Sequence, residues 1–459
     1  MNFNSLKKAE DLIQKNNIEF IDIKVIDLIG RLRHVTLPYF SGLLEKLAKD
    51  GVGFDGSSYG FAKVENSDMI LIPDYDTAVV DTFRESPTLS LYTHIILTDE
   101  KKTPFNQDGR HLVKKVEDLL KETIGADKCL WGPEFEFYIF KEVEYDTRTS
   151  TSFYRVNHEE EFYGKAYHAA NPYDIYDDFR DKACKELAKY GIRVKYHHHE
   201  VGERGQQEIE TYFEDTLTTA DNILTAKYVL FNLARQHNLY ITFMPKPMYH
   251  QAGNGMHLHL YMVKDGKNIF YKEGEYGNLN EVGRYCIGGI LKHGPALSAF
   301  TNPSTNSYKR LVPGFEAPVA LTYGMANRAG AIRIPKYVKN PQETRFEFRS
   351  PDATANPYFC LTAILLAAID GVVNKIDPIK EGFGPFDKNI SDEAAKDIHY
   401  LPRSLEDSLD ALEADKAFLK RGNIISDDLL NQWIKTKREE AKSIATMPHP
   451  FEYKMYFTL

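Results

Sequence analysis

The chain has 459 residues, 42% of them hydrophobic, which is enough for a sizeable core and for about two to four domains. Its 57 Lys and Arg against 66 Asp and Glu give a net charge of −9 without a basic block, which argues against nucleic acid as the main partner. The polar N-terminus lacks the apolar core of a signal peptide, and the longest apolar stretch, around Cys360–Ile369, is too short to span a membrane. The four cysteines lie far apart in the sequence, so we expect reduced thiols in a cytoplasmic protein.

Residues 1–103 are expected to form a small N-terminal domain. In chain order, the pattern predicts a helix over Ser5–Lys15, strands over Glu19–Asp27 and Gly30–Leu37, a helix over Ser41–Lys49, and strands around Met69–Ile72 and Leu89–Leu97. Gly51, Gly53 and Gly56 have the spacing of a dinucleotide-binding loop, but they follow a helix where that loop requires a strand. We therefore interpret them as an ordinary Gly-rich loop. The polar run Thr98–Pro104 is the expected linker.

Residues 104–459 are expected to form a larger domain that mixes strands and helices without regular alternation. The pattern predicts helices over His111–Lys121, Tyr176–Tyr190, Asp215–Asn238, Ser404–Leu419 and Ser426–Ser443, and strands at Glu134–Glu136, Ile192–Glu200, Ile241–Met244 and Met256–Val263. The C-terminal segment Pro448–Phe451 is expected to be extended. Such a mixture favours an α+β fold over one built from parallel βαβ units.

Acidic side chains alternate with aromatic ones in the segment Glu134-Phe-Glu136-Phe. A strand has a side-chain period of two, so both carboxylates would lie on one face. Two charges ~7 Å apart repel by roughly 2 kcal/mol at an effective dielectric near 20, which gives no stability but suits a bound cation. Mg²⁺ and Mn²⁺ prefer oxygen ligands, and the candidate ligand set for them is Glu134, Glu136, Glu200, Glu208, His257 and Glu347.

The run His197–His199 is a weaker candidate for metal binding. Adjacent residues of a strand alternate faces, so no more than two of these imidazoles could meet at one ion. We interpret the run as structural or as a support for true ligands.

Five arginines lie among apolar and aromatic neighbours near the end of the chain's central region. They are Arg310, Arg328, Arg333, Arg345 and Arg349. Salt bridges at the edge of the core are one interpretation, but guanidinium groups near so many carboxylates also match an anionic substrate and a transferring phosphoryl group. The Asn-, Pro- and Gly-rich segment Thr301–Glu316 is interpreted as a lid over a site.

These motifs, taken in order, resemble a type I glutamine synthetase over essentially the whole chain. They are Phe-Asp55-Gly-Ser-Ser58, Gly-Pro-Glu134-Phe-Glu136, His-His-Glu200 with Gln-Gln-Glu208, Gly-Asn-Gly-Met-His257, Asn-Ser-Tyr-Lys-Arg310-Leu-Val-Pro-Gly-Phe-Glu316, Asn-Arg328 with Ile-Arg333-Ile-Pro, and Arg345-Phe-Glu347-Phe-Arg349. Each motif alone is moderately specific, whereas the ordered combination is highly specific. The resemblance implies a small β-grasp-like N-terminal domain and a large catalytic domain built on a curved antiparallel sheet with flanking helices.

The resemblance also implies an activity: ATP-dependent ligation of ammonium to the γ-carboxylate of L-glutamate through γ-glutamyl phosphate, giving L-glutamine, ADP and phosphate. Two or more Mg²⁺ or Mn²⁺ ions would serve each active site. One would be held by Glu136, Glu200 and Glu208, and the other by Glu134, His257 and Glu347. The working protein would be a homo-oligomer, a dodecamer of two hexameric rings, in which the N-terminal domain completes the active site of a neighbouring subunit.

The remaining site residues follow from the same resemblance. ATP would contact Phe213, His259 and Arg345; glutamate would contact Gly253, Arg310 and Arg349; and ammonium would contact Ser58 and Tyr167. Arg328 and Arg333 would steady the transferring phosphate. Asp55 would help to deprotonate ammonium, while Glu316 on the lid would shield the acyl phosphate from water and accept a proton.

Two positions depart from the family pattern. Ala252 stands in the loop before His257 where the family has an Asn, and Tyr261 stands after His259 where the family has a small Ser. Two alternative functions also stay open: a sister ligase that joins glutamate to methylamine or a polyamine, and a non-catalytic relative that acts as an assembly or regulatory protein. The complete metal set counts against the second alternative.

Overall fold

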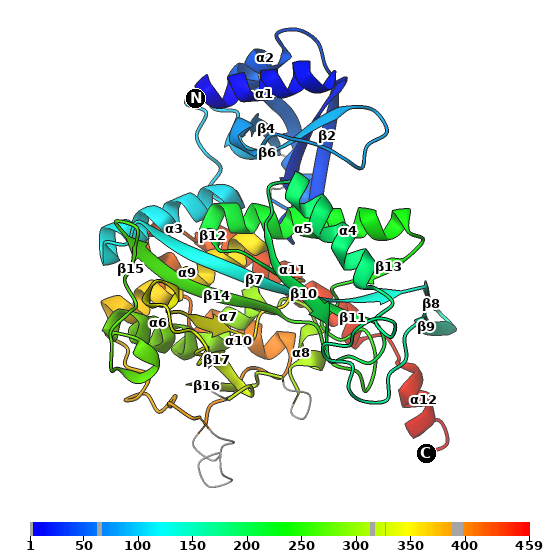
Figure 1. Cartoon of the computed structure of the whole chain (residues 1–459), viewed down its shortest axis with the longest axis vertical. Helices are drawn as coiled ribbons and strands as arrows, with labels where there is room; N and C mark the ends of the chain where they lie inside the picture. Colours follow the sequence, from blue (N-terminus) through cyan, green and yellow to red (C-terminus); the bar gives the residue numbers. More distant parts are fainter. Residues whose placement is uncertain (1–2, 62–66, 313–316, 326, 388–397) are drawn as a thin grey trace.

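The computed structural model describes residues 3–61, 67–312, 317–325, 327–387 and 398–459. Figure 1 shows a smaller N-terminal body above a larger one that contains the rest of the chain.

The N-terminal domain is a mixed six-stranded sheet with two helices, α1 (Phe3–Asn16) and α2 (Leu43–Asp50). Its strands are β1 (Phe20–Ile26), β2 (Leu32–Pro38), β3 (Val52–Asp55), β4 (Asp68–Pro73), β5 (Val79–Val80) and β6 (Thr88–Leu97). The order is β2-β1-β6-β4-β3 with β5 beside β6, and only β1 and β6 run parallel. The β-grasp fold expected from the resemblance is confirmed.

The prediction of an ordinary loop at Gly51–Gly56 was wrong, because this segment contains β3. Asp55 at the end of β3 pairs with Asp68 of β4. The strand has only four residues and includes Gly53, and glycine weakens the strand signal because it has no side chain to pack. A single turn of 3₁₀ helix, Gly56–Tyr59, follows, and the Asp55 side chain caps it by accepting a hydrogen bond from Ser57 N.

The larger body is built on a ten-stranded sheet in which β7 is the longest strand. The central order is β10 (Val194–His199), β11 (Gln206–Thr211), β7 (Lys128–Phe140), β14 (Met256–Lys264), β18 (Phe346–Phe348), β17 (Gly330–Arg333) and β16 (Ala320–Gly324). Short strands β12 (Glu214–Asp215) and β13 (Tyr240–Thr242) pair with β7, and β15 (Lys267–Asn268) pairs with β14. All the pairs are antiparallel except β16 with β17.

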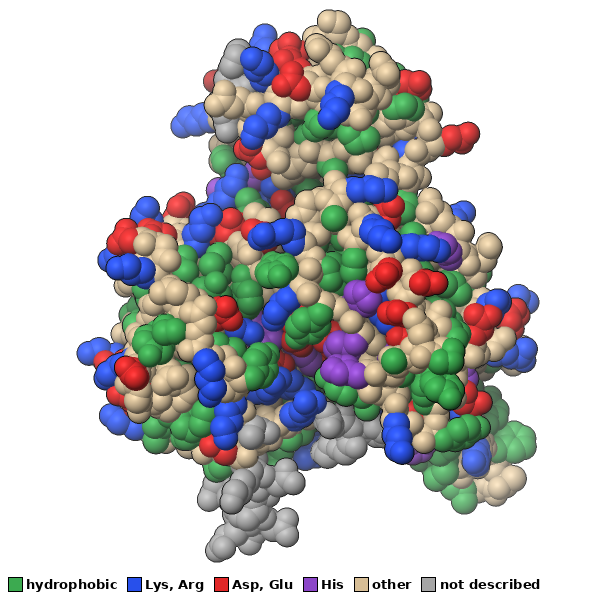
Figure 2. All heavy atoms as spheres, viewed as in Figure 1, with side chains coloured by type: hydrophobic (Ala, Val, Ile, Leu, Met, Phe, Trp, Pro, Cys, Tyr) green, Lys and Arg blue, Asp and Glu red, His purple; other side chains and the backbone are tan. Residues whose placement is uncertain are grey.

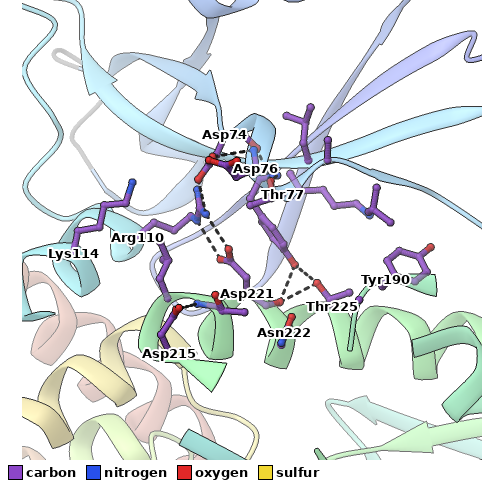
Figure 3. Close-up of a pocket in the computed structure, with 18 of the residues that line it drawn as sticks. Asp74, Asp76, Thr77, Arg110, Lys114, Tyr190, Asp215, Asp221, Asn222 and Thr225 are labelled. Carbon is purple, nitrogen blue, oxygen red and sulfur yellow. Dashed lines mark hydrogen bonds and ion pairs between the residues drawn. The ribbon is translucent and has the colours of Figure 1, made fainter. Parts of the chain in front are cut away.

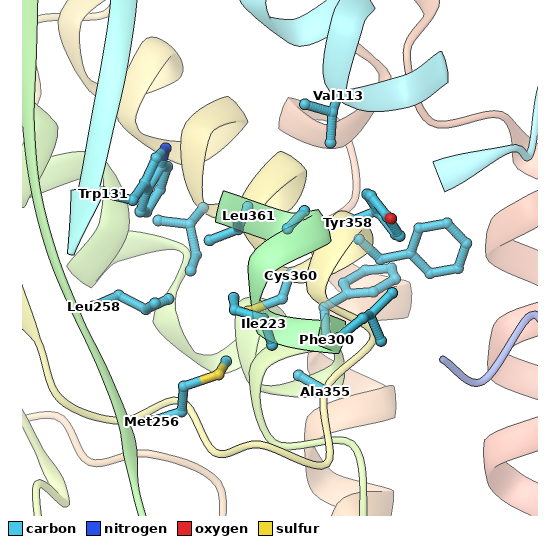
Figure 4. Close-up of a cluster of buried hydrophobic side chains, with 14 of the residues drawn as sticks. Val113, Trp131, Ile223, Met256, Leu258, Phe300, Ala355, Tyr358, Cys360 and Leu361 are labelled. Atoms are coloured by element: carbon cyan, nitrogen blue, oxygen red, sulfur yellow. The ribbon is translucent and has the colours of Figure 1, made fainter. Parts of the chain in front are cut away.

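Helices cover one face of this sheet and form the core with it. The buried face of β7 and β14 meets α3 (Gly109–Ile124), α5 (Thr216–Gln236), α7 (Gly294–Thr301) and α9 (Pro357–Val373), as Figure 4 shows for Trp131, Leu258, Ile223 and Tyr358. Phe135 and Phe137 are almost completely buried on this face. Burial of each ring stabilises the fold by about 1.5–3 kcal/mol, so the back of the sheet is firmly held.

The remaining elements complete the larger body. They are α4 (Asp177–Lys189), α6 (Glu281–Lys292), α8 (Ser307–Arg310), α10 (Leu405–Ala414), α11 (Asp427–Ala445) and the hairpin of β8 (Glu142–Arg148) and β9 (Thr151–Asn157). The expected helix over Ser404–Leu419 ends early, at Ala414, and a 3₁₀ segment follows at Phe418–Asn423. The expected helix starts at Asp215, Ser404 and Ser426 are confirmed, since each side chain caps its helix.

The prediction of an extended C-terminal segment was wrong. Residues Pro450–Tyr456 form a helix, α12, whose start is fixed by a capping box: His449 accepts a hydrogen bond from the backbone of the first turn, and Glu452 accepts one from His449 N at 2.7 Å. Pro450 at the first helical position suits a helix start, although as part of a Pro-His-Pro run it suggests extended chain.

Two expectations about composition can be compared with the structure. Cys129, Cys286 and Cys360 are buried, Cys184 is half-buried, and none of the four is in a disulfide. Among the described residues, no helix has both the length and the apolar content needed to cross a bilayer.

Candidate active site

A cleft of about 940 Å³ lies on the face of the catalytic sheet opposite its helices. In Figure 2, His and acidic side chains meet in the hollow at the centre of the molecule's face, with Lys and Arg side chains along its lower edge. Most of the cleft's lining is polar, and it includes five of the six expected metal ligands, Glu134, Glu136, Glu200, Glu208 and His257.

The alternation in β7 has the consequence expected from the sequence. Glu134 and Glu136 line the cleft, while Phe135 and Phe137 point into the core. The neighbouring strands then bring further ligand-type side chains opposite them: Glu208 of β11 pairs with Glu136, and His257 of β14 pairs with Glu134. Like charges directly opposite each other destabilise a sheet, so this register is unfavourable unless a cation is held between the strands.

The first carboxylate group consists of Glu136, Glu200 and Glu208, whose oxygens can all lie within 4.8 Å of one another. Glu200 follows the end of β10, and its backbone N–H bonds to Gln206 O across the turn, which aims its side chain back at the sheet. Burial, together with the charges of Glu136 and Glu208, raises the pKa of Glu200 to about 9. Burial and the neighbouring acids Glu134 and Glu136 likewise raise the pKa of Glu208 well above its usual range.

The second group surrounds Glu134 and contains two imidazoles where the sequence suggested one. His257 Nδ1 lies 2.9 Å from Glu134 Oε2 and 3.6 Å from Glu347 Oε1, while His259 Nε2 lies 2.7 Å from Glu134 Oε1. The ligand atoms of Glu134, His259 and Glu347 all lie within 4.8 Å of one another. We expected His257 in this set, but the structure places His259 there. Both imidazoles lie near Glu134 because the period of two in β14 puts them on the same face.

His257 instead lies between the two groups. Its Nε2 is 3.6 Å from Glu136 Oε1, on the opposite side of the ring from Glu134. It can therefore serve a cation in the second group while it also faces the first.

The histidine run has the supporting role expected for it. His198 faces the cleft, with Nε2 3.3 Å from Glu208 Oε1, whereas His199 is fully buried and contacts Glu160 at 2.9 Å. His197 approaches Asp177 and Asp181 of α4 closely enough for a third ligand group. However, Arg180 Nε donates to His197 Nδ1 at 3.0 Å, so the ring proton is on Nε2, which faces Asp181 at 3.1 Å. In this arrangement His197 has no lone pair left for an ion, so only the two carboxylates of the third group could act as ligands.

Glu347 is held between two guanidinium groups. Arg349 donates to Oε1 at 2.6 Å, and Arg333, opposite Glu347 in the β17–β18 ladder, donates to Oε2 at 2.8 Å. Burial opposes ionisation of Glu347, but Arg349 and its neighbours outweigh it and lower the pKa of this carboxyl. Arg333, Arg349, Arg328 and Arg310 all line the cleft.

Arg310 donates more hydrogen bonds to the protein itself than the sequence suggested. It is buried, and its guanidinium donates to three backbone carbonyls, of Arg349 at 3.0 Å, Ser350 at 2.8 Å and Pro351 at 3.3 Å. A guanidinium has five N–H donors, so two stay available for a ligand. Arg310 thus fixes the end of β18 as well as facing the cleft.

An aromatic and cationic set beside β7 contains Phe213, Arg345 and His259, the residues expected to contact ATP. The ring of Phe213 covers Gly132, where a Cβ would come within 3.0 Å of it, and the Arg345 guanidinium lies 5.3 Å from the ring centroid. Arg345 Nε also donates to His259 Nδ1 at 3.4 Å. Tyr261, one of the two departures from the family pattern, packs on Phe213 with ring centroids 5.1 Å apart, so it extends this aromatic surface.

The structure does not bring all the expected residues to this cleft. Gly253 and Tyr167 line it, whereas its lining does not include Asp55, Ser58, Phe213, His259, Arg345 or Glu347. Asp55 is instead exposed in the N-terminal domain, where hydrogen bonds from Ser57, Ser67 and Ser58 hold the pKa of its carboxyl well below the usual range. Glu316 lies outside the described residues.

Several residues of the cleft were not singled out from the sequence. Gln206 Nε2 donates to Gly253 O and Asn254 Oδ1, both at 3.0 Å, and so fixes the loop that contains the Ala252 departure. Tyr196 and Tyr337 also line the cleft. Gln206 could have been found, because it belongs to the same Gln-Gln-Glu motif as Glu208, whereas the two tyrosines have no sequence pattern that separates them from core aromatics.

Comparison with known proteins gives consistent matches along the chain. The sequence model of the glutamine synthetase catalytic domain matches residues 106–456, and that of the glutamine synthetase β-grasp domain matches residues 17–98. A glutamine synthetase of Frankia alni is 42% identical over 478 aligned positions, which cover 98% of this chain and 99% of the relative. A glutamine synthetase of Aquifex aeolicus (strain VF5) is 41% identical over 468 positions, with 98% of each chain covered.

Solved structures show the same architecture. The cryo-electron microscopy structure of Plasmodium falciparum glutamine synthetase superposes with a TM-score of 0.88 at 28% identity, over 99% of this chain and 98% of that one. A structure of a GmaS/ADP complex gives a TM-score of 0.83 at 28% identity, over 98% of this chain and 99% of that one.

The fold and the cleft define a two-domain ligase with a β-grasp domain and a carboxylate-lined catalytic sheet. The chain is an enzyme of the glutamine synthetase family, to which the whole matched length assigns it. Binding of ATP and of divalent metals is general in this family, and the two acidic groups in the cleft provide candidate metal ligands.

The raised pKa of Glu200 leads to a prediction for the metal-free protein. A carboxyl whose pKa rises on folding stabilises the fold at pH values below its unfolded pKa and loses that contribution as the pH approaches the folded value, here about 9. We expect the melting temperature of chelator-treated protein to fall between pH 6 and pH 9, with a slope in unfolding free energy of up to about 1.4 kcal/mol per pH unit for each of Glu200 and Glu208. Saturating Mg²⁺ should raise the melting temperature and flatten this dependence, because it binds the ionised carboxylates of the folded state only.

The matched control is Glu200→Gln, which keeps the shape of the side chain and removes the titrating group. Calorimetry of this variant without metal should give a smaller pH dependence than the parent protein. Identical melting curves with chelator and with Mg²⁺, at every pH, would contradict the assignment of this group as a cation site.

Proposed function

We propose that this enzyme joins ammonium to the γ-carboxylate of L-glutamate, with ATP as co-substrate, to give L-glutamine, ADP and phosphate. The observation that supports this most is a pair of neighbouring acidic groups, of which Glu134, Glu136, Glu200 and Glu208 line one cleft and Glu347 is bordered by Arg333 and Arg349. Such a site suits a reaction in which anionic carboxylate and phosphate must approach each other.

The donor atoms of the cleft fit Mg²⁺ or Mn²⁺, because they are carboxylate oxygens with imidazole nitrogen and include no thiolate. Glu136, Glu200 and Glu208 would hold one ion. Glu134, Glu347 and His257 would hold another, and His259 could replace His257 as a ligand of this second ion. The ions would neutralise the carboxylates and stabilise charge on the phosphoryl oxygens. Two or more ions per site are in keeping with two separate acidic groups.

ATP would lie along β7, with its base on Phe213 and near Arg345 and its phosphates toward His259. Arg310, Arg349 and the Gly253 loop would bind glutamate. A γ-carboxylate oxygen attacks the γ-phosphorus of ATP, and ADP leaves with the electrons of the broken P–O bond. Arg328 and Arg333 spread the charge of this loose transition state.

The second step needs ammonia rather than ammonium. Ammonium would be held by charge and hydrogen bonds in a pocket formed by Asp55, Ser58, Tyr167, Glu200 and Glu316. Asp55, from a neighbouring copy of the chain, would then take a proton from it. The nitrogen lone pair then attacks the acyl carbon of γ-glutamyl phosphate, and phosphate leaves. Glu316 would exclude water and accept the second proton from the adduct.

A shared site requires assembly, and we propose a homo-oligomer of two stacked hexameric rings. Asp55 and Ser58 are exposed and away from the cleft of their own chain, as a residue that serves a neighbour must be. α12 is also exposed, with Phe451, Tyr453, Met455, Tyr456 and Phe457 each more than half in solvent. A helix with so much exposed apolar surface is typical of an interface.

We propose a division into an N-terminal domain at 1–103 and a catalytic domain at 104–459, and we place the reaction in the cytoplasm, where ATP and glutamate are available and the four thiols stay reduced. Neither nucleic acid nor a membrane has a part in it. The alternative is a ligase of the same family that uses methylamine or a polyamine, and the two differ in the size of the amine pocket.

An amine panel separates these two functions. With ATP, glutamate and Mg²⁺ supplied, phosphate release should be at least about tenfold more efficient in kcat/KM with ammonium than with methylamine, because an extra methyl group in a pocket built for ammonium costs ~1–3 kcal/mol. Asp55→Ala should reduce synthesis far more than it weakens ATP binding. Equal or better turnover with methylamine, ethylamine or putrescine would assign the enzyme to the alternative.

Assembly can be tested by complementation between two inactive variants. Asp55→Asn impairs the N-terminal domain's contribution to the active site of the neighbouring subunit. Arg333→Ala impairs the catalytic domain's contribution to the active site of its own subunit. Rings that contain both variants should regain some activity, because a fraction of their sites combine two intact halves. A monomer mass by light scattering under assay conditions, or no activity in mixed rings, would contradict the shared site.

A further inference from the structure

An arginine in the catalytic domain joins the two domains of the chain. Arg110 is the second residue of α3, and its NH2 donates to Asp74 of the N-terminal domain at 2.9 Å. On the catalytic side, Nε and NH2 donate to the two oxygens of Asp221 in α5, at 3.1 and 2.9 Å. Figure 3 shows Arg110 between these two carboxylates, where the strands of the N-terminal domain meet the helices below.

This ion triad is buried and closely supported. The Arg110 side chain is only 4% exposed, and Tyr358 donates a hydrogen bond to Asp221 from behind. Burial alone would lower the pKa of Arg110, but Asp221 and Asp74 outweigh it and raise this pKa further. Loss of one partner from a buried ion group leaves the others without compensation, so the geometry of the triad is strongly determined.

The triad is one of several contacts between the domains. A cleft of about 920 Å³, lined by both domains, lies beside it, so apolar packing does not fill this side of the joint. Further hydrogen bonds across the joint include those at Asp81, which accepts from Tyr190 and Tyr228 at 2.9 and 2.8 Å, that at Leu28 O, which accepts from Asn356 at 3.1 Å, and those that join Thr82 to Glu186 and Tyr92 to Thr225, both at 2.9 Å. These should keep the domains together when the triad is broken.

Asp74 is connected to Asp55 through a stiff element. It follows directly after β4, and Asp68 at the start of β4 pairs with Asp55 of β3. The six residues of β4, Asp68–Pro73, span about 20 Å, so a rotation of about 5° at the joint would move Asp55 by about 2 Å. Displacement of a catalytic group by about 1 Å can cost about a hundredfold in rate.

We propose that Arg110 is a positioning residue: by tying Asp74 to Asp221 it sets the orientation of the N-terminal domain and thereby the place of Asp55 in the active site of a neighbouring subunit. This inference rests on the proposed shared site. Arg110 touches neither substrate nor metal ligands and acts only through the domain that it holds.

The first experiment uses single variants of the full-length enzyme. Arg110→Gln and the milder Asp74→Asn should each raise the KM for ammonium at least about tenfold, while the KM for ATP changes less than about twofold. Arg421→Gln is the matched control, because Arg421 donates to Asp370 at 2.6 Å within the catalytic domain and does not cross the joint. Its KM for ammonium should equal that of the parent, whatever its melting temperature. If Arg110→Gln does not fold, Asp74→Asn keeps the shape of the side chain and decides the question.

The second experiment tells a positioning role from a general weakening of the catalytic domain. Two doubly substituted chains are co-expressed with differently tagged partners, and mixed rings are purified through both tags. In one mixture, Arg110→Gln is combined with Arg333→Ala and paired with Asp55→Asn, so every live site uses the N-terminal domain of the Arg110 variant. In the other, Arg110→Gln is combined with Asp55→Asn and paired with Arg333→Ala, so every live site uses its catalytic domain.

The first mixture should show the raised KM for ammonium, and the second should have the KM of Asp55→Asn paired with Arg333→Ala. Equal KM values in the two mixtures, or a raised KM in the second alone, would overturn the positioning role while leaving the shared site intact. If Asp55→Asn paired with Arg333→Ala, without any substitution at Arg110, has no activity, the shared site itself is overturned, and the positioning role with it.

Discussion

Repulsion between carboxylates is the constraint on which the rest of this structure depends. Glu136 and Glu208 lie directly opposite each other in a sheet, and Glu200 completes a group in which burial and mutual charge raise the pKa values of Glu200 and Glu208. Repulsion would move these carboxylates apart unless packing elsewhere in the protein fixed the strands that carry them. The apolar side of β7, with Phe135 and Phe137 buried in the core, supplies this packing, so one strand carries both the repelling carboxylates and the apolar side chains that fix it.

Carboxylates that line the cleft or lie directly behind its wall have pKa values perturbed in opposite directions. Arg349 and Arg333 lower the pKa of Glu347, and the imidazoles of His259 and His257 lower that of Glu134, in spite of their burial. Glu200, after the end of β10 in the same sheet, instead has its pKa raised to about 9. Environments that separate the pKa values of neighbouring acids are typical of catalytic sites, because they keep some groups ionised while others can exchange protons. A purely structural protein has no use for this arrangement.

The sequence was most informative where one local period decides the outcome. The period of two in Glu134-Phe-Glu136-Phe predicted which side chains face the cleft, and capping residues such as Asp215 predicted helix starts. It was least informative about local segments with conflicting signals, namely β3 and α12. It also could not rank His257 against His259, since a period of two gives both the same face. The contact of Arg110 with Asp221 joins residues 111 positions apart, and no local pattern marks it.

The two domains differ in how their positions are fixed. Within the catalytic domain, each site residue is placed by ladder pairing and by a continuous core, so its position is determined many times over. Across the joint, polar contacts such as those of Arg110 act beside aromatic packing of Phe83 on Tyr190 and Tyr228, and an open cleft lies next to them. Ion pairs and hydrogen bonds specify direction more sharply than apolar packing does, because they weaken steeply away from linear geometry. The polar contacts can therefore set the orientation of the N-terminal domain, while Asp55 and Ser58 stay exposed and can face another subunit.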